Sequence, residues 1–110
     1  LNSALEVTSS QVSIGTNITV GLHNSLRKSG NLVQMILTVN NKWDWDGARE
    51  LYIGNVPTGY RPSTERFGHG ATKGKITFGY SVYPDGIIRF WPNEKLTSGD
   101  EICLNTTWII

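Results

Sequence analysis

Two runs of alternating apolar and polar side chains most constrain the fold of this 110-residue chain. They occupy residues 17–27 (NITVGLHNSLR) and 32–40 (LVQMILTVN), and the turn residues KSGN lie between them. A period of two is the repeat of a β-strand with one buried face, so the pair predicts a β-hairpin. The apolar side of the first run consists of Ile18, Val20, Leu22 and Leu26.

The same alternation returns in the second half of the chain. Residues 75–83 (KITFGYSVY) and 87–91 (IIRFW) flank a Pro-Asp-Gly turn, which predicts a second strand pair. Residues 101–110 (EICLNTTWII) form a last strand, with Trp108 in the core. Cys103, the single cysteine, excludes an internal disulfide and is expected to be a buried structural thiol.

These strands predict an all-β fold, either a small antiparallel β-barrel or a jelly-roll-like sandwich of six to eight strands. No segment has the 3.6-residue period of a helix, and the 12 glycines add to a composition that disfavours helices. Residues 17–110 are interpreted as one domain, and residues 1–16 as a first strand or the end of a connector. Residues 55–75, with two prolines and four glycines, predict a long loop with one short strand in its middle.

Several classes of function have no signal in this sequence. A net charge of +1 gives no basic face for nucleic acid, and no apolar run approaches the ~20 residues of a membrane span. His23 and His69 lack a zinc-ligand spacing, and DWDG at residues 44–47 lacks the remaining ligands of a calcium loop. We therefore expect no catalysis, no cofactor and no metal site.

Aromatic and polar residues supply the candidate site instead. In NNKWDWDGARE (residues 40–50) the two indole rings are two positions apart, so both project to one side of an extended chain. They either pack against the end of the sandwich or form a platform for a sugar ring, with carboxylates and an arginine holding the hydroxyls. Arg89 and Trp91 share one side of their strand, and His69, in a glycine-rich loop, is either a ligand donor or a surface residue without a role. The predicted saccharide-binding residues are Trp43, Asp44, Trp45, Asp46, Arg49, His69, Arg89 and Trp91.

Three segments resemble the C-terminal head domain of bacteriophage receptor-binding proteins from phages of lactococci, streptococci and related Gram-positive bacteria. They are SLRKSGNLVQMILTV, VPTGYRPSTERFGHG and GYSVYPDGIIRFWPNEKLTSGDEICLNTTWI. The shared order is a hairpin at residues 26–33, a proline-bracketed loop at 57–62, a turn with Asp-Gly at 83–88 and a final strand. The resemblance covers about residues 17–110.

The resemblance implies a homotrimeric adhesion head in the phage tail tip or baseplate. Such a head binds host cell-wall saccharide without covalent chemistry and contacts other tail proteins through its N-terminus. Two alternatives stay open: a structural trimerisation or adaptor domain without its own ligand, and, more remotely, a glycan-degrading enzyme using Asp44 and Glu50.

Overall fold

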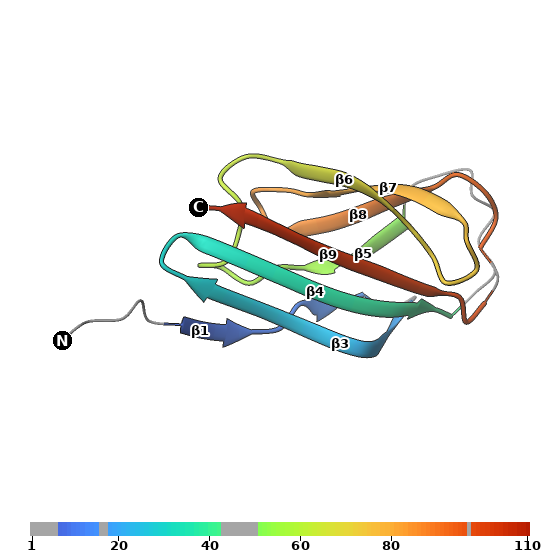
Figure 1. The fold of residues 1–110 in the computed structure, drawn as a ribbon, viewed down its shortest axis with the longest axis horizontal. Helices are drawn as coiled ribbons and strands as arrows, with labels where there is room; N and C mark the ends of the chain where they lie inside the picture. The colour runs from blue at the N-terminus through green and yellow to red at the C-terminus, as the bar shows by residue number, and fades with distance from the viewer. Residues whose placement is uncertain (1–6, 16–17, 43–50, 97) are drawn as a thin grey trace.

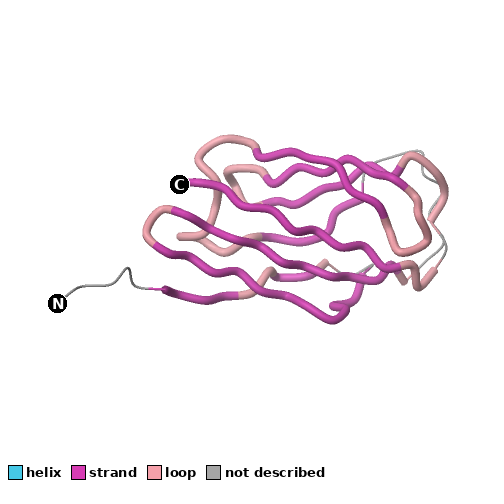
Figure 2. The backbone as a smooth tube through the Cα atoms, in the orientation of Figure 1, coloured by secondary structure: helices cyan, strands magenta, loops and turns pink. Residues whose placement is uncertain are grey.

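The structure, a computed structural model, describes residues 7–15, 18–42, 51–96 and 98–110. These residues form nine strands in two antiparallel sheets that face each other, and they contain no helix (Figures 1 and 2). The predicted all-β sandwich is confirmed. The described strands exceed the expected six to eight because a two-residue strand, β2, forms near the start. No helix in these ranges has the length and hydropathy needed to cross a membrane.

The predicted hairpin lies at the centre of the first sheet. This sheet has the order β1 (Val7–Ser10), β3 (Ile18–Ser29), β4 (Leu32–Asn41) and β9 (Glu101–Ile109). Gly30 takes a positive φ of 61° in the turn between β3 and β4. Two residues of the predicted apolar side are not buried: Val20 is 46% exposed and Leu22 is 81% exposed. The pairing of β3 with β4 shifts between Val20 and Asn24, so Leu22 lies in a bulge. A bulge adds residues to one strand, so the strict alternation breaks there.

The second sheet contains the other predicted strand pair. Its order is β2 (Ser13–Ile14), β5 (Leu51–Asn55), β8 (Ile87–Pro92), β7 (Thr77–Val82) and β6 (Arg66–Ala71). The turn between β7 and β8 closes with a 2.8 Å hydrogen bond from the Gly86 amide to the Tyr83 carbonyl. Gly86 has a φ of 93°, a backbone conformation that disfavours other residues.

The start of the described chain belongs to both sheets. β1 pairs with β3 in the first sheet, and β2 pairs with β5 in the second. Residues 7–14 therefore cross from one layer to the other, and the buried Val12 lies at this crossing.

The core lies between the sheets and is supplied by alternate residues of both. Val33, Met35, Leu37 and Val39 of β4 are fully buried, as their alternation predicts. Trp108 is in the core, which confirms its prediction. Cys103 is exposed, so the expectation of a buried thiol is wrong. Its neighbours Ile102 and Leu104 point inward, and successive side chains in a strand alternate between faces.

The predicted long loop contains its expected short strand, β6. His69 lies in this strand and not in a mobile loop, which corrects the prediction. A Cβ on Gly68 would lie 2.9 Å from the Tyr80 hydroxyl oxygen, and one on Gly70 would lie 2.9 Å from the Phe78 ring. The glycines of FGHG therefore occupy positions where rings of β7 need the space, while Phe67 and His69 are exposed.

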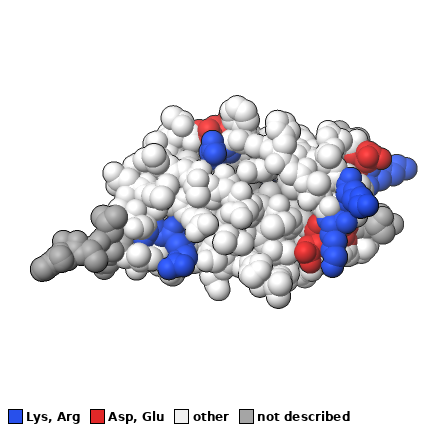
Figure 3. Space-filling model, viewed as in Figure 1, with Lys and Arg blue, Asp and Glu red and all other residues white. Residues whose placement is uncertain are grey.

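Charged side chains are sparse on the face of the molecule shown in Figure 3. They occur in a few small groups, and most of this face is uncharged. The surface in this view therefore carries no extended field of one sign.

Candidate functional site

Two rows of side chains cross the outer face of the second sheet. The pairing aligns His69 of β6 with Gly79 of β7, and Gly79 with Trp91 of β8. The residues of the second row are directly opposite one another in the same way and are Phe67, Ser81, Arg89 and Tyr52. Residues paired across strands have Cβ atoms about 4.5–5.5 Å apart, so each row is a set of direct neighbours.

Gly79 leaves a gap in the first row. Without a side chain at this position, the imidazole of His69 and the indole of Trp91 face each other across bare backbone. A Cβ on Gly79 would lie 3.7 Å from Cδ2 of His69, so the imidazole leans over the glycine. The result is an open hollow of about 390 Å³ whose lining includes His69, Gly79 and Trp91.

Phe67 and Glu65 extend this hollow toward the β6 edge. Phe67 is 68% exposed, which is unusual for a phenyl ring. Glu65 accepts a 2.7 Å hydrogen bond from the Ser81 hydroxyl, and this bond fixes a carboxylate beside the ring. Apolar ring surface and an oriented carboxylate therefore lie side by side.

Core packing on the opposite face of the same strands fixes the shape of the hollow. Phe78 and Phe90 pack edge to face with ring centroids 5.4 Å apart, and Tyr80 lies beside Phe78 at 6.3 Å. All three rings are buried. The strands that carry His69, Gly79 and Trp91 are thus fixed by the core, so a ligand on the outer face meets a preformed surface.

The chemistry of this surface suits a polyhydroxylated ring. Indole and phenyl faces favour the C–H face of a sugar, and the carboxylate of Glu65, the imidazole of His69 and the guanidinium of Arg89 supply hydrogen bonds of fixed direction. His69, Arg89 and Trp91, predicted separately from the sequence, are brought together on this one sheet face.

The other predicted residues lie outside the described part of the chain. They are Trp43, Asp44, Trp45, Asp46 and Arg49, in the segment that joins β4 to β5. Their role in saccharide binding stays a prediction. Leu51, the first described residue after that segment, pairs with Phe90, next to Trp91.

Four residues of the two rows were not predicted: Tyr52, Phe67, Gly79 and Ser81. Phe67 could have been predicted as a site residue, because it is two positions from His69 and therefore lies on the same side of the strand. Gly79 and Ser81 had no such signal in the sequence, because their importance depends on the residues that lie opposite them on the neighbouring strands. The register between two distant strands cannot be deduced from the sequence of either strand alone.

The described residues contain no cluster of three or more histidine, cysteine, aspartate or glutamate side chains that could hold a metal ion. No protein-family model matches the sequence, and no curated protein matches it.

Proposed function

We propose that this protein is the saccharide-binding head of a phage receptor-binding protein, and that it binds host cell-wall glycan at the outer face of the second sheet. The observation that carries the proposal is the hollow over Gly79, with His69 on one side and Trp91 on the other. Exposed aromatic side chains beside oriented polar groups are the usual elements of a carbohydrate site. The resemblance of residues 17–110 to phage adhesion heads points to the same class of ligand.

A head of this kind gains from assembly. An open hollow makes few contacts with one sugar, and a single site of millimolar strength is worth only about 4 kcal/mol. Several sites presented together raise the avidity by ~10²–10⁴ without new contacts.

The first sheet offers a surface for such assembly. Val7, Ser29, Leu32 and Ile109 are paired in sequence across all four of its strands. The three apolar members are 50%, 49% and 68% exposed, in chain order. Exposed apolar residues that are contiguous commonly mark protein contacts. We infer that this row contacts other copies of the chain in a homotrimer, which leaves the saccharide face of each copy open.

Two matched variants test the saccharide site. Trp91→Ala removes one wall, whereas Gly79→Val fills the hollow without removing any functional group. We expect both to lose binding to cell-wall polysaccharide fragments of lactococci or streptococci, measured by calorimetry. Leu22→Ala, on the bulge of the other sheet, is the control and should bind like the wild type. Unchanged binding by both site variants would exclude this face as the site.

The apolar row also favours the second candidate, a structural adaptor without its own ligand. In that case Ile109→Lys disrupts assembly, while Trp91→Ala changes no measurable property of the particle or of cell attachment. Loss of cell attachment by an intact Trp91→Ala assembly supports the adhesin instead. The glycan-degrading alternative is tested by release of reducing ends from the same fragments, with Asp44→Asn as the comparison.

A further inference from the structure

The two outermost strands of the first sheet, β1 and β9, each have a side that is open to another strand (Figure 1). Among the described residues, no strand extends the sheet beyond β1. β9 meets β6 only at one end, where Thr72 bridges to Ile102 and the Lys73 amide donates a 2.9 Å hydrogen bond to the Glu101 carbonyl. An edge strand with free backbone groups pairs readily with a strand of another chain.

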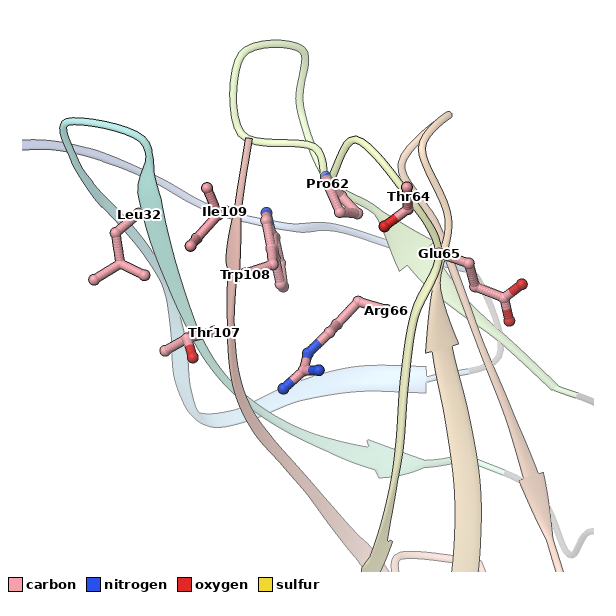
Figure 4. A pocket seen from close by; sticks show the side chains of 8 residues that line it. All are labelled: Leu32, Pro62, Thr64, Glu65, Arg66, Thr107, Trp108 and Ile109. Atoms are coloured by element: carbon pink, nitrogen blue, oxygen red, sulfur yellow. The ribbon is translucent and has the colours of Figure 1, made fainter.

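Away from that end, a hollow of about 440 Å³ separates β9 from β6. Its lining includes Thr107 of β9 and Arg66 of β6. Figure 4 shows the guanidinium of Arg66 extending into this space. The edge of β9 near Thr107 is therefore not covered by β6.

The register shows which backbone groups point outward at the two edges. The Glu101 carbonyl points to β6, and backbone groups alternate in direction along an antiparallel strand, so the N–H and C=O of Thr107 point the same way. Thr107 lies opposite Gln34, Gln34 opposite Arg27, and Arg27 opposite Ser9. Carried across this row, the alternation turns the N–H and C=O of Ser9 to the open side of β1.

The two edges also match in direction and in side chains. Neighbouring strands of this four-stranded sheet are all antiparallel, so β1 and β9 run in opposite directions. β1 of one copy can therefore pair with β9 of a second copy that has the same orientation. Val7 and Ile109, which end the apolar row at these two edges, then lie on the same face and continue the row from copy to copy. Thr8 and Ser10 turn to the other face, where their small hydroxyl side chains fit beside Arg66.

We propose that copies of this chain associate by strand addition, with β1 of one copy paired antiparallel to the open edge of β9 of the next copy near Thr107. The contact joins two different edges, so it is head-to-tail and closes into a ring when the rotation between copies is a whole fraction of a turn. The proposal rests on the homotrimer inferred above and specifies the backbone contact that forms it. The outer face of the second sheet takes no part in this pairing.

Backbone amide exchange tests the pairing directly. In the assembled wild type, the amides of Ser9 and Thr107 should exchange about tenfold more slowly or better than in the Leu32→Lys variant, measured as a monomer, because strand pairing protects an amide. The amide of Glu94, in the loop between β8 and β9, is the control and should exchange at the same rate in both proteins. A trimer in which the amides of Ser9 and Thr107 exchange as fast as in the monomer overturns strand addition, although the trimer itself stands.

Proline variants test the same hydrogen bonds by removing their donors. Ser9→Pro and Thr107→Pro each remove an N–H that points out of the sheet, a position where edge strands tolerate proline. Each should raise the concentration at which the trimer dissociates at least about tenfold, measured by light scattering over a dilution series. Ser9→Ala and Thr107→Ala lose the same hydroxyls but keep the N–H, so they should assemble like the wild type. The two proline variants lie in different strands, and either one that keeps the strand signal in circular dichroism is sufficient.

Three further results are decisive. Wild-type assembly by a folded proline variant overturns the proposal, and so does a wild-type dimer, because identical edges would then pair with each other. A wild-type monomer overturns both this proposal and the homotrimer. None of these results changes saccharide binding at the Gly79 hollow, which is measured on a single copy with Trp91→Ala, so failure of the assembly and failure of the saccharide site are distinguishable.

Discussion

The side-chain amide of Asn24 hydrogen bonds to both backbone polar groups of Val12. The Val12 N–H donates to Oδ1 at 2.8 Å, and Nδ2 donates to the Val12 carbonyl at 2.9 Å. This two-point contact replaces a strand pairing at the place where the chain crosses between the sheets. Asn24 is also the residue at which the pairing of β3 with β4 resumes after the bulge.

Replacing Asn24 with Ala should destabilise the protein by about 1–3 kcal/mol, because both polar groups of Val12 lose their partner while Val12 itself stays buried. Urea unfolding monitored by tryptophan fluorescence measures this loss as a lower midpoint. His23→Ala, one position away and exposed, is the control and should change the midpoint little. Equal midpoints for the two variants would show that the amide contact contributes nothing.

Two glycines of the second sheet should respond in opposite ways to alanine. A Cβ on Gly54 would lie 2.2 Å from the Ser13 carbonyl oxygen, which belongs to backbone and cannot move aside cheaply. Gly54→Ala is therefore expected to cost roughly 1–3 kcal/mol of stability. At Gly79 the nearest atom would be 3.7 Å away, an ordinary contact. Gly79→Ala should be neutral or stabilise by about 0.5–1 kcal/mol, since alanine restricts the unfolded chain.

Thermal or urea unfolding of the two glycine variants, compared with the wild type, checks this pair. Destabilisation of similar size at both positions would contradict the open space described at Gly79.

The indole N–H of Trp108 connects the last strand to the proline-bracketed loop through the Tyr60 carbonyl. Trp108→Phe keeps most of the buried ring but removes this donor, so we expect a loss of about 1–2 kcal/mol. Hydrogen exchange should show faster exchange at the amide of Tyr60, which donates to the Pro57 carbonyl within the same loop. Trp91→Phe, on the outer face, is the control and should leave both the unfolding midpoint and that exchange rate nearly unchanged.

Assembly should depend on the apolar row of the first sheet. Leu32→Lys or Ile109→Lys places a charge in this row and should convert the expected trimer into monomers, measured by light scattering after gel filtration. Leu22→Lys carries the same charge at a more exposed leucine outside the row and should leave the trimer intact. A wild-type protein that is monomeric at high concentration would contradict the inferred role of this surface.

The sequence predicted those parts of the fold in which alternation is undisturbed. The β3–β4 hairpin and the β7–β8 pair follow from apolar residues two positions apart, and so does the outward direction of Arg89 and Trp91. Leu22 was misplaced because a bulge inserts residues without a local signal. Cys103 was misplaced although its own alternation with Ile102 and Leu104 indicated the outer face.

β6 shows why composition can conceal a strand. Its inner positions are Gly68 and Gly70, so no apolar alternation marks it, and glycine-rich sequence favours a loop. Those glycines are needed by Tyr80 and Phe78 of the neighbouring strand. The hollow over Gly79 could not be predicted from the sequence either, because it results from a register that places a glycine between a histidine and a tryptophan.

The inward-facing glycines of β6, Gly68 and Gly70, also bear on how such a protein can evolve. Because the rings of β7 fill the space under this strand, Phe67 and His69 take no part in core packing, and new side chains at these two positions leave the interior unchanged. If this face binds saccharide as proposed, point mutations there alter which ligand is preferred at almost no cost in stability. An edge strand of this kind allows recognition to diversify while the scaffold stays the same.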